Sequence, residues 1–314
     1  MILTITPNPL LSYVLHLPTL PPPGANRVAS LPWTVGGKGI NVARMLKTLG
    51  RPGLALGFAG GPNGDKIKAR LTEHGISARL IPCSSETRVG FDLIVDHPRT
   101  HHWWLEDGQT LTEREILDLL AELDRWLPQA RFLALSGTLP GQTSADFYRR
   151  IIEQARPFRV EIFLDARGAP LNQAVEVGGF FLKHNRQEFM ETFGHDPFHN
   201  PWDNPSFHRL RDHGIPGALI TDGGGPALLW DPPRFHVLLP PPVQEVSAVG
   251  CGDAALAGFL YARACGASML DAARWAMAAG AADAGHAAPC AATADEVEAL
   301  LPLVEIRAIP IPPA

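Results

Sequence analysis

Cysteine is scarce in this chain. Only four occur among 314 residues, and they are widely scattered, at Cys83, Cys251, Cys265 and Cys290. No two of them form a C-x-x-C pair or follow the spacing of metal ligands. The pattern argues against a disulfide framework and a cysteine metal site, and it indicates reduced thiols in a cytoplasmic protein.

Excess positive charge and long apolar runs are missing as well. The formal net charge of −5 gives no reason to expect nucleic acid or an anionic membrane as a partner. No apolar run is long enough to span a bilayer, and Met1–Pro7 lacks the features of a signal peptide. Twelve histidines are present, but the adjacent His101 and His102 would point to opposite faces of a strand. We therefore expect no histidine metal site.

The strongest positive signal lies between Ser247 and Phe259. Gly250 and Gly252 allow a tight turn and close approach to a ligand. The residues that follow, to about position 263, are almost all good helix formers and are apolar nearly all round, which predicts a buried helix. A glycine turn before such a helix directs free N–H groups and the positive dipole end at one point. We therefore predict an anion site at Gly250, Cys251 and Gly252.

Asp253 places a carboxylate beside this anion site. It would repel a bound phosphate, unless it serves to take the proton from an attacking hydroxyl. The combination indicates phosphoryl transfer to an alcohol, with Asp253 as base. Two alternatives compete: Asp253 as a favourable first-turn acid, and a dinucleotide turn, because Gly250, Gly252 and Ala255 fit G-x-G-x-x-A. The prolines at 240–242 leave no clear strand before the turn, which argues against the dinucleotide interpretation.

Predicted strands and helices alternate along the chain. This order indicates one α/β domain over residues 1–314, with a mostly parallel central sheet flanked by helices. The expected strands are 2–6, 53–58, 131–136, 159–164, 180–183 and 218–221, and the expected helices are 39–49, 65–73, 144–154, 186–192, 253–263 and 268–284.

Two segments break the alternation. One pairs residues 13–17 with 27–35 across the stiff triplet Pro21–Pro23, and the other is a hairpin of 88–95 and 101–105. Each lies between a strand and the next helix. We therefore expect a small β-sheet lid, built from about 12–35 and 87–106.

A second glycine-rich turn opens the first helix. Gly36, Gly37 and Gly39 surround Lys38 and allow close approach by a polar substrate, and Asn41 lies in the first helical turn. The segment is not a Walker A loop, because Lys38 is followed by Gly39 and not by Ser or Thr. A plain strand-to-helix turn, with Asn41 as a cap, is the alternative.

Three further polar turns follow predicted strands. Asn185 and Glu188 could hold hydrated Mg²⁺ or form a capping box, which the spacing slightly favours. The turn Thr221–Gly225 could cradle nucleotide phosphates or make a hairpin. Ser136 begins the third turn. Because the carboxyl ends of parallel strands carry the ligand site, we expect these turns, Asn8 and Gly250–Asp253 to converge.

Taken together and in this order, these segments resemble the phosphofructokinase B branch of the ribokinase-like carbohydrate kinases. The resemblance covers nearly the whole chain and is closest to 1-phosphofructokinases and tagatose-6-phosphate kinases. Its motifs are Thr6–Pro9, Gly36–Ala43, Ser136–Pro140, Lys183–Glu188 and Gly250–Asp253, the last with Cys251 in place of the usual Ala. It implies a ribokinase-like fold, a β-lid that often forms a homodimer interface, and the use of ATP and Mg²⁺.

The resemblance also implies roles for particular residues. Asp253 would be the base, and Gly250, Cys251 and Gly252 the anion hole. Acceptor contacts are expected from Asn8, Ser12, Gly36, Gly37, Lys38, Asn41, Arg88 and Ser136. The nucleotide is expected at Lys183, Asn185, Thr221, Gly223, Gly225 and Gly280, and the metal at Asn185 and Glu188.

The chain departs from the family pattern in the acceptor region. Ser12 stands where the family has an Asp that grips sugar hydroxyls, and Gly90 and Asp92 replace the Asn and Lys of its lid motif. Arg88 is retained as a possible phosphate ligand. Trp103 and Trp104 could stack on a ligand, fill a dimer contact or form a lid core. Pro226 replaces a glycine of the nucleotide loop.

We therefore predict an ATP-dependent kinase that phosphorylates a hydroxyl of a small sugar phosphate. Fructose 1-phosphate and tagatose 6-phosphate are the acceptors that the resemblance implies. The alternatives are a kinase for an unphosphorylated sugar or nucleoside, and a binding or regulatory protein with weak turnover.

Overall fold

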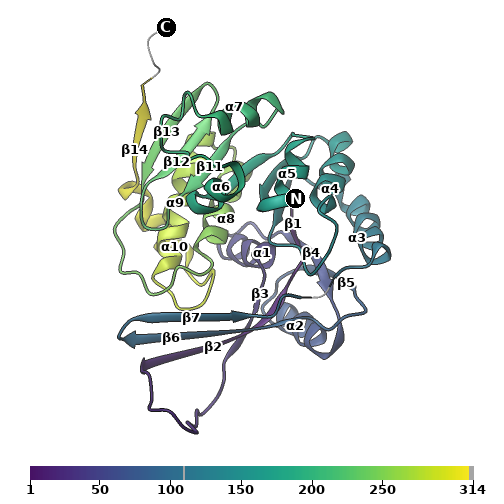
Figure 1. The fold of residues 1–314 in the computed structure, drawn as a ribbon, viewed down its shortest axis with the longest axis vertical. Helices are drawn as coiled ribbons and strands as arrows, with labels where there is room; N and C mark the ends of the chain where they lie inside the picture. The colour runs from purple at the N-terminus through teal and green to yellow at the C-terminus, as the bar shows by residue number, and fades with distance from the viewer. Residues whose placement is uncertain (109, 311–314) are drawn as a thin grey trace.

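A large sheet and a small sheet organise the computed structural model, which describes residues 1–108 and 110–310 (Figure 1). The large sheet has ten strands in the order β14-β13-β12-β11-β10-β9-β8-β1-β4-β5. They are β1 (Ile2–Thr6), β4 (Leu54–Ala59), β5 (Ala78–Pro82), β8 (Phe132–Ser136), β9 (Glu161–Asp165), β10 (Phe181–Asn185), β11 (Ala218–Thr221), β12 (Ala227–Asp231), β13 (Arg234–Leu239) and β14 (Glu305–Ile309). The run from β11 to β5 is parallel, and β12 to β14 continue it antiparallel.

Helices cover both faces of the large sheet. One layer contains α1 (Lys38–Thr48), α2 (Gly61–Glu73), α8 (Cys251–Ala264), α9 (Met269–Ala284) and α10 (Ala294–Leu300). The opposite layer contains α3 (Glu113–Trp126), α4 (Phe147–Ala155), α5 (Gly168–Val175), α6 (Arg186–Phe193) and α7 (Pro205–Asp212). None of the helices in the described part of the chain is long and apolar enough to cross a membrane.

The small sheet is the predicted lid. Its order is β3-β2-β6-β7, with β2 (Leu10–Thr19), β3 (Trp33–Gly36), β6 (Val89–His97) and β7 (Thr100–Leu105). β2 and β6 are parallel, and each has an antiparallel neighbour. The lid projects from the main body below α1 and α10 (Figure 1). The α/β architecture and the lid are therefore confirmed.

Several local predictions are wrong in their bounds. The lid strand expected at 27–35 is formed only at Trp33–Gly36, because Pro21–Pro23 and Pro32 lack the N–H groups that pairing requires. Helix α2 begins at Gly61, with Pro62 in its first turn, and not at Asp65. Helix α10 and the edge strand β14, which follow the last predicted helix, were not predicted.

Glycine lets α1 lie directly against the end of β1. A Cβ atom at Gly39 would lie 2.5 Å from the backbone oxygen of Ile5, so no larger residue fits without moving the helix. At Gly37, φ is 121°, and a Cβ would lie 2.6 Å from Cγ2 of Thr6. The turn before α1 is thus held close to the carboxyl end of the central strand.

Candidate active site

The functional side chains lie where parallel strands end. Lys38 starts α1, Asp165 ends β9, and Lys183 lies near the end of β10. Nζ of Lys38 donates to Oδ1 of Asp165 at 2.6 Å and lies 3.9 Å from Oε1 of Glu188. Lys38 therefore connects the start of α1 with the end of β9 and with α6, which follows β10.

Charge pairing keeps Lys38 and Asp165 ionised in this site. Burial lowers the pKa of Lys38, but Asp165, Glu188 and Asp253 outweigh it, so that the pKa is raised. Burial raises the pKa of Asp165, but the charges of Lys38 and Lys183 outweigh it and lower the pKa overall. Lys183 differs, because burial lowers its pKa despite the attraction of Asp165. The site thus offers one firmly charged lysine and one that burial makes less basic.

Asp253 is buried in the first turn of α8, with 5 % of its surface exposed. Burial is the main reason why its pKa is raised to about 7, an effect that Lys38 partly offsets. Nδ2 of Asn41 donates to Oδ2 of Asp253 at 2.8 Å. A base whose pKa lies near neutrality is well suited to accept a proton from an alcohol.

Arg44 orients the amide of Asn41. Its NH1 donates to Oδ1 of Asn41 at 2.6 Å, so the amide nitrogen must point toward Asp253. The same guanidinium donates to the carbonyls of Val35 in β3 and Pro289 after α9. One half-buried side chain therefore connects β3 at the root of the lid, Asn41 in α1 and the loop after α9. The chain alone gave no signal for Arg44, which lies in an ordinary helical pattern.

The predicted anion turn has the geometry that its glycines suggested. Gly250 is the N-cap of α8 with φ 90°, and a Cβ there would lie 2.4 Å from Cβ of Pro289. A Cβ at Gly252 would lie 3.5 Å from Nζ of Lys183, so this lysine lies beside the turn. Burial raises the pKa of Cys251 to about 12, which leaves its thiol neutral. The turn and Lys183 together suit a phosphoryl group.

The capping box at Asn185 and Glu188 is present. Oδ1 of Asn185 accepts from the Glu188 N–H at 2.8 Å, and Oε2 of Glu188 accepts from the Asn185 N–H at 3.4 Å. In the described residues, no group of three His, Cys, Asp or Glu side chains could hold a metal ion. Oε1 of Glu188 makes no hydrogen bond within the described residues, which fits a hydrated Mg²⁺ that keeps most of its waters.

The residues expected to bind the nucleotide lie at two places, the ends of β10 and β11 and helix α9. Thr221 ends β11, where its hydroxyl lies 3.2 Å from Nζ of Lys183. Gly223 and Gly225 form the turn into β12, so the hairpin alternative is correct as a description of the backbone. Gly280 instead supports packing, because a Cβ there would lie 3.2 Å from the carbonyl oxygen of Cys251.

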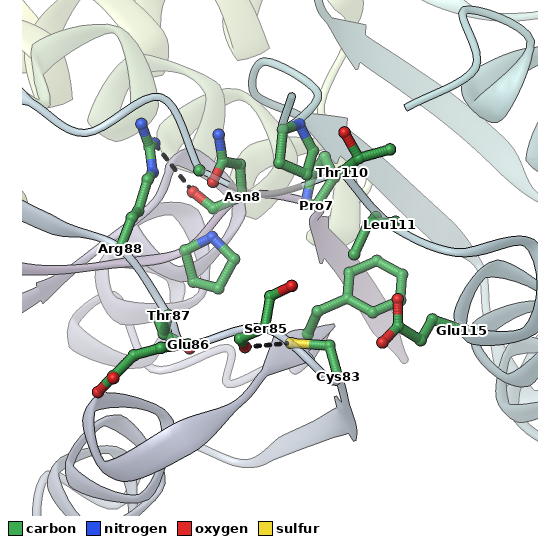
Figure 2. Close-up of a pocket in the computed structure, with 14 residues that line it drawn as sticks. Pro7, Asn8, Cys83, Ser85, Glu86, Thr87, Arg88, Thr110, Leu111 and Glu115 are labelled. Atoms are coloured by element: carbon green, nitrogen blue, oxygen red, sulfur yellow. Dashed lines mark hydrogen bonds between the residues drawn. The ribbon is translucent and has the colours of Figure 1, made fainter. Parts of the chain in front are cut away.

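Several of the residues expected to bind the acceptor make contacts within the protein or are buried. Arg88 donates to the carbonyl of Asn8 at 3.0 Å, and Figure 2 shows it reaching over Asn8 at the edge of a small pocket. Its other amino group donates to the carbonyl of Glu106, also at 3.0 Å. Burial lowers the pKa of Arg88. Ser136 is fully buried at the end of β8, so it does not face an open surface.

Gly36 and Ser12 belong to the root of the lid. A Cβ at Gly36 would lie 2.8 Å from Cδ2 of Leu10, so Leu10 covers this glycine. Ser12 is buried and donates to Oδ2 of Asp92 at 2.8 Å. Asp165 was missed, although it directly follows a predicted strand and obeys the strand-end rule used for its neighbours.

The fold and this arrangement define a ribokinase-like α/β protein with a glycine turn before a buried helix and a lid. The description "pfkB family carbohydrate kinase" matches residues 5–295. The chain belongs to this family and is a carbohydrate kinase.

Named relatives and a solved structure agree with the family. The chain is 32 % identical over 298 residues to ATP-dependent 6-phosphofructokinase isozyme 2 of Mycobacterium tuberculosis, covering 95 % of this chain and 88 % of the relative. It is 29 % identical over 260 residues to 1-phosphofructokinase of Bacillus subtilis, covering 83 % and 84 %. A structure of the tetrameric inhibited form of phosphofructokinase-2 from Escherichia coli superposes with TM-score 0.85 at 23 % identity, covering 96 % and 98 %.

Asp253→Asn tests the base directly. We expect turnover to fall by about two to four orders of magnitude, because the amide cannot accept the acceptor's proton. Binding of ATP, measured by calorimetry, should change little. Asp283→Asn is the matched control, since Asp283 in α9 lies beside the same turn but accepts hydrogen bonds from the backbone N–H groups of Cys290 and Ala291. Turnover of Asp253→Asn within a few-fold of the wild type would rule out this role.

Proposed function

We propose that the protein transfers the γ-phosphoryl group of ATP to a hydroxyl of a sugar phosphate, in the manner of the phosphofructokinases. The observation that carries the proposal is the buried carboxylate of Asp253 next to the Gly250–Gly252 turn and Lys183. A base and an anion site in adjacent positions suit an alcohol that attacks a phosphoryl group.

The steps follow from the positions of these groups. Asp253 accepts the proton as the acceptor oxygen bonds to the γ-phosphorus, and the bond from that phosphorus to its bridging oxygen breaks to release ADP. The N–H groups of the Gly250–Gly252 turn and Nζ of Lys183 stabilise the charge on the transferring group. Lys38 is held by Asp165 and keeps a positive charge beside the reacting groups. Mg²⁺, bound at Asn185 and Glu188, would neutralise phosphate charge.

The names of the relatives support a sugar phosphate as the acceptor, but they do not decide which sugar phosphate it is. Their names include both 1-phosphofructokinase and 6-phosphofructokinase, and none of those given above names tagatose 6-phosphate. We therefore propose a phosphorylated ketohexose as acceptor, with fructose 6-phosphate and fructose 1-phosphate as the first compounds to test.

Arg88→Ala tests how the acceptor phosphate is bound. With ATP and Mg²⁺, we expect the KM for the better of these two sugar phosphates to rise about tenfold or more, because a charge-assisted hydrogen bond is lost. The KM for ATP should stay within about twofold. Arg88→Lys is the control, since it keeps the charge but not the fork of donors.

Two outcomes would count against this proposal. An acceptor KM that does not change in Arg88→Ala would place the phosphate elsewhere. Faster turnover of unphosphorylated fructose or of a nucleoside than of either sugar phosphate would replace the proposed acceptor class.

The outer face of the lid suits a homodimer. Tyr13, Leu15, Phe91, Leu93 and Trp104 share one face by strand register, which we call the outer lid face. Trp104 is 54 % exposed and packs against Phe91, with ring centroids 5.9 Å apart. Exposed aromatic groups of this kind favour burial against a second copy of the same face.

Trp104→Glu tests the homodimer. Light scattering after size exclusion should give about twice the 33.9 kDa chain mass for the wild type and the chain mass for the variant. The control is Leu117→Glu, because Leu117 is 47 % exposed on α3, away from the lid. A monomeric wild type, or a variant that stays dimeric, would contradict the interface.

A further inference from the structure

The opposite face of the lid contains a polar cluster made by three strands. Ser12 in β2 donates its hydroxyl proton to Oδ2 of Asp92 in β6, at 2.8 Å. Nε2 of His101 in β7 lies 3.3 Å from Oδ1 of the same carboxylate. Ser12, Asp92 and His101 are referred to here as the inner lid cluster.

Two contacts bring the lid that carries this cluster close to the catalytic body. Ser12 pairs with Thr34 of β3, two residues before Gly36 and the start of the α1 turn. At the other end of the lid, Arg99 donates to the carbonyl of Glu245, in the segment that leads to Gly250. Because the lid is attached near both catalytic turns, its inner face borders the space between them.

The carboxylate of Asp92 lacks a strong cation. Asp92 is 7 % exposed, and among the described residues its only ionic partner is the imidazole of His101. A carboxylate has about four acceptor positions, and Ser12 and His101 use two of them. Burying such a group is costly unless further donors reach it. A ligand with several hydroxyl groups would supply those donors, whereas a dianionic phosphate would be repelled.

The surface next to Asp92 is apolar. A Cβ at Gly90 would lie 2.5 Å from Cδ1 of Leu10 and 2.9 Å from Cδ2 of Leu105, so these leucines fill the position beside it. The family's Asn at this place would clash with them. The polar side chains of Arg88, directly before β6, and of Asp92, within β6, are therefore separated on this face.

We propose that Asp92 is the specificity-determining residue for the acceptor. Held by Ser12 and His101, it accepts hydrogen bonds from hydroxyl groups of the sugar and keeps the acceptor's phosphate away from this part of the lid. Ser12 and Asp92 thus act together and are not two unrelated departures from the family pattern. The carboxylate lies on β6 and the hydroxyl that holds it lies on β2. The inference rests on the proposed kinase function.

Asp92→Asn is the test, because it keeps the size and the partner Ser12 but removes the charge. We expect the KM for the preferred sugar phosphate to rise about tenfold, with the KM for ATP and kcat nearly unchanged. Asp96→Asn is a closely matched control. Asp96, also in β6, makes the same kind of pair with His16 in β2, at 2.8 Å, but its side chain is 46 % exposed.

Monodeoxy analogues of the preferred acceptor identify the contact. For the wild type, kcat/KM should be about tenfold lower with one analogue than with the parent sugar phosphate. For Asp92→Asn, kcat/KM should be nearly the same with that analogue and with the parent sugar phosphate. An acceptor KM that is equal in Asp92→Asn and the wild type, or equal losses on every analogue in both proteins, would overturn the inference.

The experiment separates this inference from the proposed function. If the wild type phosphorylates neither fructose 6-phosphate nor fructose 1-phosphate, the kinase proposal fails for this acceptor class. Calorimetric titration with fructose 6-phosphate then tests Asp92 alone. A tenfold weaker Kd in Asp92→Asn than in the wild type and Asp96→Asn supports its role, and an equal Kd or no binding by the wild type refutes it.

Discussion

Burial of the Asp253 carboxylate is the constraint on which the rest of the site depends. The nearest strong cation in the charge network, Lys38, is engaged with Asp165, and Asp253 forms no ion pair among the described residues. Its direct polar partner is the amide of Asn41. Burial without a full counter-charge holds the pKa near 7, where a carboxylate is basic and about half of it is ionised at neutral pH. The turn beside it requires Gly250, because φ is positive there and a larger residue would not fit beside Pro289.

Hydrogen bonds connect the lid to this site. Arg44 connects β3 to Asn41 and so to Asp253, while Arg99 connects the lid tip to the segment before α8. The lid and the base are therefore parts of one hydrogen-bonded structure. The two faces of the lid carry different side chains: the outer lid face is aromatic and aliphatic, and the opposite face carries Ser12, Asp92 and His101 together with the exposed Trp103. Alternation of side chains along three strands is enough to place the hydrogen-bonded cluster on one face of the lid and the proposed homodimer contact on the other.

Local patterns predicted most of this architecture, because each turn follows a strand in a parallel sheet. The glycines before α8, the turn before α1 and the capping box at Asn185 were visible as short motifs. Contacts between distant segments were not visible. Lys38 meets Asp165, 127 residues away, and Ser12 meets Asp92, 80 residues away. The sequence showed the identity of Ser12 and Asp92, but only the register of β2 against β6 shows that they share one hydrogen bond. The start of β3 was misjudged because proline-rich chain next to it resembles an extended strand.

The most direct test of this account is a measurement of the Asp253 pKa. The difference between ¹³C NMR spectra of the wild type and Asp253→Asn, both labelled at the aspartate carboxyl carbon, isolates its resonance during a pH titration. The account predicts a midpoint near 7, since burial is the main influence on this group. In Arg44→Met the midpoint should move upward, because the amide of Asn41 is no longer oriented toward the carboxylate. A wild-type midpoint near the ordinary aspartate value of about 4 would contradict the central claim that a buried carboxylate is the base.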